Sequence, residues 1–173
     1  MNDHVHPTPD AFPTFADIEN RIERVCARVP GSDRQPVLLK MLLQHIAGGL
    51  NSRMNEVLRE YNLNRISFLA LVMLVSSGGK PLNPSDLAEA TGESRANVTR
   101  ICDELVAKSL LRREPNPEDR RRIDLYLAPQ GEELVQRTLP KIQNHAFSPF
   151  NDLTAEERDL LEAILKKLLG AFA

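Results

Sequence analysis

Apolar residues recur at intervals of three and four along most of the chain, the spacing that gathers side chains on one face of an α-helix. Asn64, Asn83, Ser94 and Thr154 each stand directly before such a stretch, where their side chains can accept hydrogen bonds from the first helical N–H groups. The stretch after Asn64 is apolar on nearly every side and should be enclosed by protein. The pattern predicts helices over residues 15–29, 37–61, 65–76, 84–91, 95–108, 129–150 and 155–172.

A pattern typical of β-strands follows the fifth of these helices. Two short runs, 110–114 and 123–127, are separated by a loop rich in proline and arginine, which predicts a β-hairpin with a long basic tip. In the second run, apolar residues at odd positions alternate with Asp124 and Tyr126, so one face should pack inward while the other meets solvent. Leu82 is expected to add a minimal strand.

The fourth and fifth helices are short and are joined by a tight turn at Gly92, which predicts a helix-turn-helix. Pro84 occupies the first helical position, where a missing N–H costs nothing, and Asp86 lies near the positive end of the helix. A helix fits the major groove of B-DNA, and a thin arginine-bearing arm fits the minor groove beside it. The helix-turn-helix and the basic hairpin together therefore point to duplex DNA.

Charge is distributed unevenly, although the net charge is only −2. Residues 95–122 hold eight Lys and Arg against five Asp and Glu, a net of +3, and the remainder of the chain carries −5. A polyanion should be attracted to this segment and repelled elsewhere. The alternative interpretation is an ordinary solvated face.

The composition, with 42% apolar and 27% charged residues in a chain of 173, is that of an ordinary soluble protein. The longest apolar run, 68–75, is far below the roughly 20 residues of a membrane helix, and no secretory signal is visible, so we expect a cytoplasmic protein without membrane contact. Cys26 and Cys102 are expected to be small buried residues rather than redox sensors. No catalytic or metal-ligating cluster is recognisable, so we expect no enzyme, no cofactor and no metal site.

The order and spacing of three motifs resemble the MarR family of bacterial winged-helix regulators over residues 65 to 173. The segment 94–105, with the helix around His45 upstream, is most similar to the EmrR branch, whose members repress multidrug efflux operons and respond to phenolic and lipophilic compounds. The motifs are Asn83-Pro84-Ser85-Asp86-Leu87-Ala88, Ser94-Arg95-Ala96-Asn97-Val98-Thr99-Arg100, and Asp119-Arg120-Arg121 followed by Leu125-x-Leu127-x-x-x-Gly131.

Two positions depart from the pattern of the family. Ala128 stands where the family usually has threonine, and a capping hydroxyl of that kind contributes about 1 kcal/mol. Ser109 stands where glycine usually follows the second helix of the motif, and it is expected to adopt a left-handed backbone conformation.

The resemblance implies a mainly α fold, with a winged helix-turn-helix over 62–128 that carries a small β-hairpin wing. The N- and C-terminal helices, 14–61 and 129–173, are implied to form a dimerisation region, and the proline-rich residues 1–13 are expected to be a disordered tail. The apolar stripe of the last helix is wider than one packing partner requires, so a second chain would cover the excess. The expected interface residues are Phe15, Ile18, Leu161, Ile164, Leu165, Leu168 and Leu169.

Seven residues are candidates for contact with a palindromic DNA operator. Arginine can pair with guanine and asparagine with adenine, whereas serine and threonine hydroxyls suit phosphates or either base. The resemblance implies that Arg121 enters the minor groove and that Asp119 orients the wing tip. The candidates are Ser94, Arg95, Asn97, Thr99, Arg100, Arg120 and Arg121.

His45 has two interpretations, because it lies on the apolar stripe of the second helix. It is either an ordinary interior histidine or, as the resemblance to the family implies, the polar anchor of a cavity for an aromatic or phenolic effector between the dimerisation helices and the DNA-binding lobe. Methionines would supply adaptable apolar walls, and arginine a positive charge for an anionic ligand. The candidate ligand-binding residues are Arg28, Met41, His45, Arg53, Met54 and Phe68.

These observations predict a homodimeric transcriptional repressor of efflux, stress or aromatic-catabolism genes, released from its operator by a small aromatic or phenolic ligand. The alternative is a dimeric small-molecule-binding or scaffolding protein of the same fold without specific DNA binding.

Overall fold

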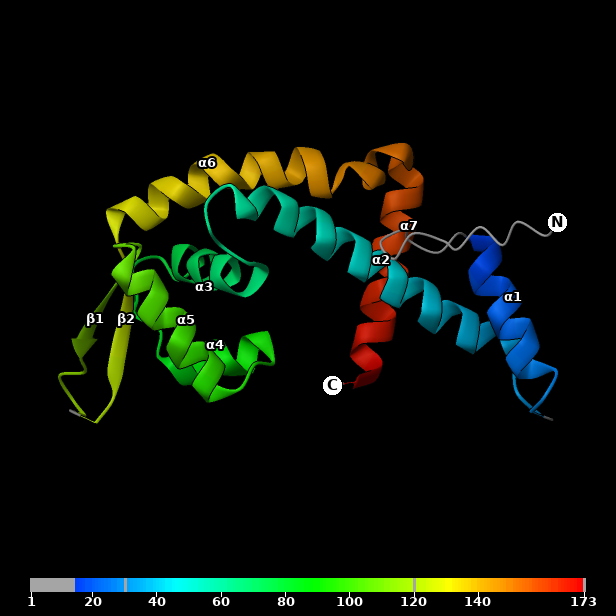
Figure 1. The fold of residues 1–173 in the computed structure, drawn as a ribbon, viewed down its shortest axis with the longest axis horizontal. Helices are drawn as coiled ribbons and strands as arrows, with labels where there is room; N and C mark the ends of the chain where they lie inside the picture. The colour runs from blue at the N-terminus through cyan, green and yellow to red at the C-terminus, as the bar shows by residue number, and fades with distance from the viewer. Residues whose placement is uncertain (1–14, 30, 120, 173) are drawn as a thin grey trace, which may run out of the picture. The chain divides into compact units, whose positions relative to one another are not determined.

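The computed structural model describes residues 15–29, 31–119 and 121–172, and the chain divides into two compact units between Ser52 and Arg53, within one helix. The expected tail, 1–13, lies outside the described residues. The described chain is mainly helical with one two-stranded antiparallel sheet, which confirms the predicted fold class. In chain order (Figure 1) the elements are α1 Phe15–Cys26, α2 Arg34–Arg59, α3 Arg65–Ser76, α4 Pro84–Thr91, α5 Arg95–Ala107, β1 Leu111–Pro115, β2 Ile123–Leu127, α6 Pro129–Ala146, η1 Ser148–Asp152, α7 Ala155–Leu169 and η2 Gly170–Phe172.

The start of α2 lies three residues before the predicted one. Asp33 Oδ1 accepts a hydrogen bond from the N–H of Gln35 at 3.0 Å, so an acid caps the helix at a point that the apolar pattern does not mark. Pro36 then falls within the first turn, where its missing N–H has no helical partner to lose. In the same unit Arg34 Nη2 donates to Glu19 Oε1 of α1 at 2.5 Å.

Helix α3 lies in the core of the second unit, as its apolar pattern predicts. Asn64 Oδ1 caps it by accepting the N–H of Ser67 at 2.9 Å. Each leucine enclosed in this way contributes about 1.5–3 kcal/mol through burial of apolar surface. The enclosed residues of this core include Leu58, Leu71, Leu74, Leu87, Ile101, Leu105, Leu125 and Ile142.

The helix-turn-helix is built from local caps. Asn83 and Asp86 form a reciprocal capping box at the start of α4, with bonds of 2.9 and 3.0 Å. Gly92 ends α4 in the left-handed region at φ 69°, which glycine adopts without a steric penalty. Ser94 Oγ then accepts the N–H of Asn97 at 3.2 Å and starts α5. These caps set the turn between the two helices.

The hairpin has the predicted pairing, and Leu82 adds a third short segment through two backbone bonds with Leu125, of 2.8 and 3.1 Å. The expected alternation in β2 is wrong at its start, because Ile123 is 37% exposed whereas Asp124 is buried. Both carboxylate oxygens of Asp124 accept hydrogen bonds from Asn116 Nδ2, Oδ2 at 3.0 Å and Oδ1 at 3.2 Å. A side-chain partner across the hairpin thus overrides the apolar pattern.

The two ends of the wing meet at Leu110. Ser109 has φ 58°, as expected for a residue in the place of glycine, and the N–H groups of Ser109 and Leu110 bond to carbonyls of α5 in a Schellman arrangement. The carbonyl of Leu110 accepts the N–H of Ala128 at 3.1 Å. Ala128 starts α6 without a side-chain cap, as its missing hydroxyl predicts. Gly131 lies over the same carbonyl, so close that a Cβ atom would come within 2.3 Å of the Leu110 oxygen.

Polar pairs join α6 to the C-terminal part of α2 and to the residues that directly follow it. His145 Nε2 lies 2.8 Å from Glu56 Oε2, and Lys141 Nζ donates to Glu60 Oε2 at 3.2 Å. A hydrogen bond between Lys141 and Tyr61 lowers the pKa of the Tyr61 hydroxyl and raises the pKa of the Lys141 ammonium. The pairs are exposed to solvent, so they orient the two helices more than they stabilise them.

The described helix α7 has no buried side chain. Thr154 and Glu157 form the predicted capping box at its start, with bonds of 2.8 and 3.2 Å. α6 ends at Ala146, earlier than predicted, because Pro149 has no N–H to continue the helical bonding to the His145 carbonyl, which accepts from Ser148 Oγ at 3.0 Å instead. The large apolar side chains exposed on α7 and η2 are Leu160, Ile164, Leu165, Leu168, Leu169 and Phe172.

Gly131→Ala should lower the free energy of unfolding by about 1–3 kcal/mol, because the added methyl group overlaps the Leu110 carbonyl. Gly170→Ala is the matched control, since Gly170 has a helical backbone and nothing within 4 Å of an added Cβ. Urea denaturation of both variants measures the difference. A Gly131→Ala variant with wild-type stability would contradict the close approach.

Candidate nucleic-acid interface

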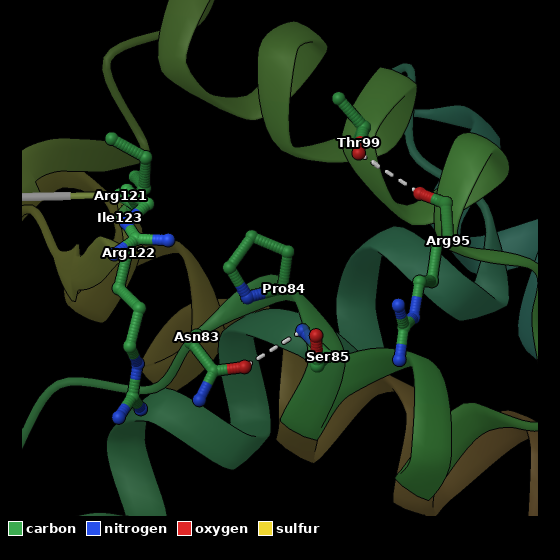
Figure 2. A pocket seen from close by; sticks show the side chains of 8 residues that line it. All are labelled: Asn83, Pro84, Ser85, Arg95, Thr99, Arg121, Arg122 and Ile123. Atoms are coloured by element: carbon green, nitrogen blue, oxygen red, sulfur yellow. Dashed lines mark hydrogen bonds between the residues drawn. The ribbon is translucent and has the colours of Figure 1, made fainter. Parts of the chain in front are cut away.

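A pocket of about 290 Å³ opens among the start of α4, the start of α5 and the end of the hairpin loop (Figure 2). Three arginines from two separate segments border it, and its eight lining residues contain no acid. It is therefore a positively charged hollow, suited to an anion. The lining residues are Asn83, Pro84, Ser85, Arg95, Thr99, Arg121, Arg122 and Ile123.

The five candidates on α5 lie on two sides of the helix. Arg95 and Thr99 line the pocket, and Thr99 Oγ1 donates to the Arg95 carbonyl at 2.9 Å (Figure 2). Helical spacing turns Asn97 and Arg100 away from that side, and Arg100 Nη2 donates to Asn97 Oδ1 at 2.9 Å. Ser94 is exposed and its hydroxyl caps the helix. The outer surface of α5 thus presents donors and acceptors along both flanks.

The wing tip is held by a chain of side-chain to backbone bonds. Asn116 Oδ1 accepts the N–H groups of Glu118 and Asp119, both at 2.9 Å, and Asp119 Oδ1 accepts the N–H of Arg121 at 3.0 Å. The side chain of Arg121 is 97% exposed, and its Nε lies 3.9 Å from Asp119 Oδ1. Arg120 lies outside the described residues. Side-chain bonds thus hold the backbone N–H groups of Glu118, Asp119 and Arg121, while the Arg121 side chain extends into solvent.

Arg113 of β1 connects the wing to α5. Its Nη1 pairs with Asp103 Oδ1, and its Nη2 donates to the Thr99 carbonyl at 3.3 Å. Burial raises the pKa of the neighbouring Cys102 thiol, and the positive charge of Arg113 opposes that shift only in part. The thiol is therefore protonated and enclosed, whereas Cys26 is half-buried beside Ser32.

Several residues of this interface are absent from the sequence-based candidates. Arg113 and Asn116 act through bonds to distant residues, and Asn83, Ser85 and Arg122 enter the pocket only once the hairpin folds against α4. The turn-forming sequence Pro115-Asn116-Pro117 was the available signal for Asn116, since asparagine commonly bonds to the backbone two residues on. Asn83 and Ser85 belong to the first motif, where Asn83 was expected only as a helix cap, and Arg113 and Arg122 carry no local signal.

The candidate ligand residues divide between the two units. Arg28, Met41 and His45 belong to the first unit, where Arg28 is exposed and the other two are half-buried. In the second unit, Phe68 is buried, Met54 packs against the core, and Arg53 Nη1 donates to Ser148 Oγ at 3.1 Å. Their role in ligand binding stays a prediction.

The candidate interface residues differ in exposure. Phe15 is exposed and Ile18 is buried within the single chain. On α7, Leu161 is half-buried, and a hollow of about 330 Å³ lies between it and Phe150, Leu165 and Leu169. The remaining candidates, Ile164 and Leu168, are exposed.

Two further findings concern metal binding and membrane-spanning helices. Within the described part of the chain, no three His, Cys, Asp or Glu side chains come together in a way that could hold a metal ion. Among the described helices, none has both the length and the apolar character needed to cross a bilayer.

Comparison with known proteins agrees with the arrangement of these elements. A model of the MarR family matches residues 61–122. The transcriptional repressor MprA of Escherichia coli K12, also named EmrR, is 33% identical over 157 residues, which cover 91% of this chain and 89% of MprA. The HTH-type transcriptional regulator PapX of Escherichia coli is 27% identical over 136 residues, 79% of this chain and 83% of PapX.

Solved structures lead to the same family. A mutant MarR from E. coli in complex with operator DNA superimposes with a TM-score of 0.69 at 26% identity, over 80% of this chain and 99% of MarR. Wild-type MarR from E. coli in its apo form gives a TM-score of 0.65 at 25% identity, over 76% and 96%. From the near full-length likeness to MprA and the shared order of helix-turn-helix and wing, the chain belongs to the MarR family of transcriptional regulators.

Proposed function

We propose that the chain is a transcriptional repressor that binds duplex DNA through α5 and the wing. The pocket bordered by Arg95, Arg121 and Arg122 carries the proposal, because it joins three positive charges to the N-terminal turn of α4. Arginine guanidinium groups and serine hydroxyls bind backbone phosphates, and Ser85 of α4 lines the same pocket. The likeness to an operator-bound MarR supports the same mode of binding.

In the proposed complex, α5 enters the major groove and the wing lies along the adjacent minor groove. Arg95, Asn97, Thr99 and Arg100 have the side chains that read base edges or contact phosphates. Arg121 is the wing residue best suited to a narrow minor groove, since its side chain extends into solvent while its backbone N–H is bonded to Asp119.

The repressor is proposed to act as a homodimer on a palindromic operator. Two half-sites one helical turn apart, about 34–36 Å, require two linked copies of α5. The exposed leucines of α7 supply an apolar face for a second copy, in line with the dimerisation role that the sequence predicts.

A small aromatic or phenolic ligand is proposed to release the dimer from DNA. Release requires tighter binding of the ligand to the free dimer than to the DNA complex, because equal affinity for both states shifts no equilibrium. The sequence-based candidate for the polar anchor of that ligand is His45, which is half-buried on α2.

Arg121→Ala should weaken operator binding by about 1–3 kcal/mol, the usual contribution of a base-contacting arginine, while the melting temperature hardly changes because the side chain packs on nothing. Arg59→Ala, at an exposed arginine in the last turn of α2, is the control. Fluorescence anisotropy with promoter duplex and a scrambled duplex gives both affinities. Unchanged binding by Arg121→Ala would refute the wing assignment, whereas no preference for any promoter sequence in the wild type would argue against DNA recognition and favour a scaffolding role.

Deleting residues 161–173 should produce a monomer and lower operator affinity by about 10²–10⁴-fold through loss of the second half-site contact. Leu168→Glu should do the same with the helix retained, whereas Lys167→Glu, at the neighbouring position, should leave the dimer intact. Light scattering and DNA titration together test this. A monomeric variant with native operator affinity would refute the dimeric mode.

A saturating aromatic acid or phenol should lower operator affinity by about 5- to 150-fold, which corresponds to a coupling of about 1–3 kcal/mol. His45→Ala should reduce that response and leave ligand-free DNA binding intact. His145→Ala is the matched histidine control, because His145 pairs with Glu56 at the protein surface. DNA titrations with and without salicylate-like compounds measure the response, and an equal response in all three proteins would remove His45 from the ligand site.

A further inference from the structure

One flank of α5 carries a continuous chain of four side chains. Asn97 Nδ2 donates to Glu93 Oε2 at 2.7 Å, and Asn97 Oδ1 accepts from Arg100 Nη2 at 2.9 Å. Arg100 Nη1 in turn pairs with Glu104 Oε1. The spacings of three and four residues align Asn97, Arg100 and Glu104 along one stripe of α5, on the flank away from the pocket, and Glu93 extends this stripe from the turn before the helix.

These hydrogen bonds therefore occupy the donors and acceptors of Asn97 and Arg100 that would contact DNA bases. Asparagine pairs with adenine through both ends of its amide, and here one end is held by a carboxylate and the other by a guanidinium. Arg100 likewise has both terminal nitrogens engaged. Two acids at the ends of the stripe, Glu93 and Glu104, complete these contacts and add negative charge to the surface that would face the duplex.

The two acids affect different kinds of DNA contact unequally. Binding that does not depend on DNA sequence comes from arginine and lysine side chains in contact with phosphates. A carboxylate beside Arg100 competes for the guanidinium donors and also repels phosphate. A base edge carries no net charge, so it is less repelled, and a correct base replaces each bond that Asn97 and Arg100 give up.

Building on the proposed function, we propose that Glu93 and Glu104 determine the sequence specificity of α5. They keep Asn97 and Arg100 from contacting DNA of arbitrary sequence and release them to a site whose bases satisfy both side chains. The acids act through their neighbours, so they position the reading residues rather than contact the bases.

Glu104→Gln is the main test, because it removes the charge and keeps an oxygen that can accept from Arg100. Glu93→Gln repeats the change at the other end of the stripe. Glu89→Gln, an exposed acid of α4, is the control for the same loss of net charge. The full-length wild-type dimer first selects its preferred duplex from a random-sequence library, and each variant is then titrated with that duplex and with a scrambled one across a range of salt concentrations.

Both stripe variants should bind the scrambled duplex about 2- to 5-fold more tightly, the effect of one surface charge, with little gain on the selected duplex. Their ratio of specific to non-specific affinity should therefore fall by about the same factor, whereas Glu89→Gln keeps the wild-type ratio. An equal gain on both duplexes, or an equal effect of Glu89→Gln, would overturn the inference and leave the proposed function standing. A wild type that selects no sequence would instead overturn the proposed function, and the inference with it.

Discussion

The geometry of the winged unit depends on the peptide group of Leu110. Its N–H ends α5 by bonding to the Leu105 carbonyl at 2.9 Å, and its carbonyl receives Ala128 at the start of α6. β1 begins directly after Leu110, and the residue that follows β2 bonds back to it, so a single backbone junction fixes the last turn of α5, the base of the wing and the start of α6. Gly131 is required where α6 passes over that junction.

Arg113 extends this junction from the backbone to the side chains. It reaches from β1 to Asp103 and to the Thr99 carbonyl, which lie one turn apart on α5. Wing and helix are thereby joined twice, once at the end of α5 and once along its flank. The proposed binding to two grooves at once needs this fixed relation, since an error in either element would misplace the contacts of the other.

The features that could be predicted from the sequence are those encoded locally. The caps at Asn64, Asn83 and Ser94, the turn at Gly92 and the left-handed Ser109 are all set by residues within a few positions, and each was expected. The order of the motifs then indicated the family. The exposed face of α7 was also visible in advance, because its apolar stripe exceeds what one chain can cover.

The features that could not be predicted depend on partners far apart in the sequence. The buried Asp124 contradicts its expected outward position because Asn116, eight residues earlier, satisfies it across the hairpin. Arg113 and Arg122 look like any other arginine of the basic segment until the hairpin folds. Hydrophobic periodicity records which residues avoid water, but it does not record which polar groups pair with each other.

The exposed face of α7 links the concentration of the protein to its rate of degradation. An isolated helix of 15 residues is marginal in water, and within the described chain this one buries no side chain. If a second copy covers it, as proposed, then the free energy that orders the C-terminus rises with chain concentration by mass action. Scarce, unassembled chains would display a frayed, leucine-rich end to cellular proteases, while paired chains would hide it. The half-life of the protein would then follow its degree of assembly.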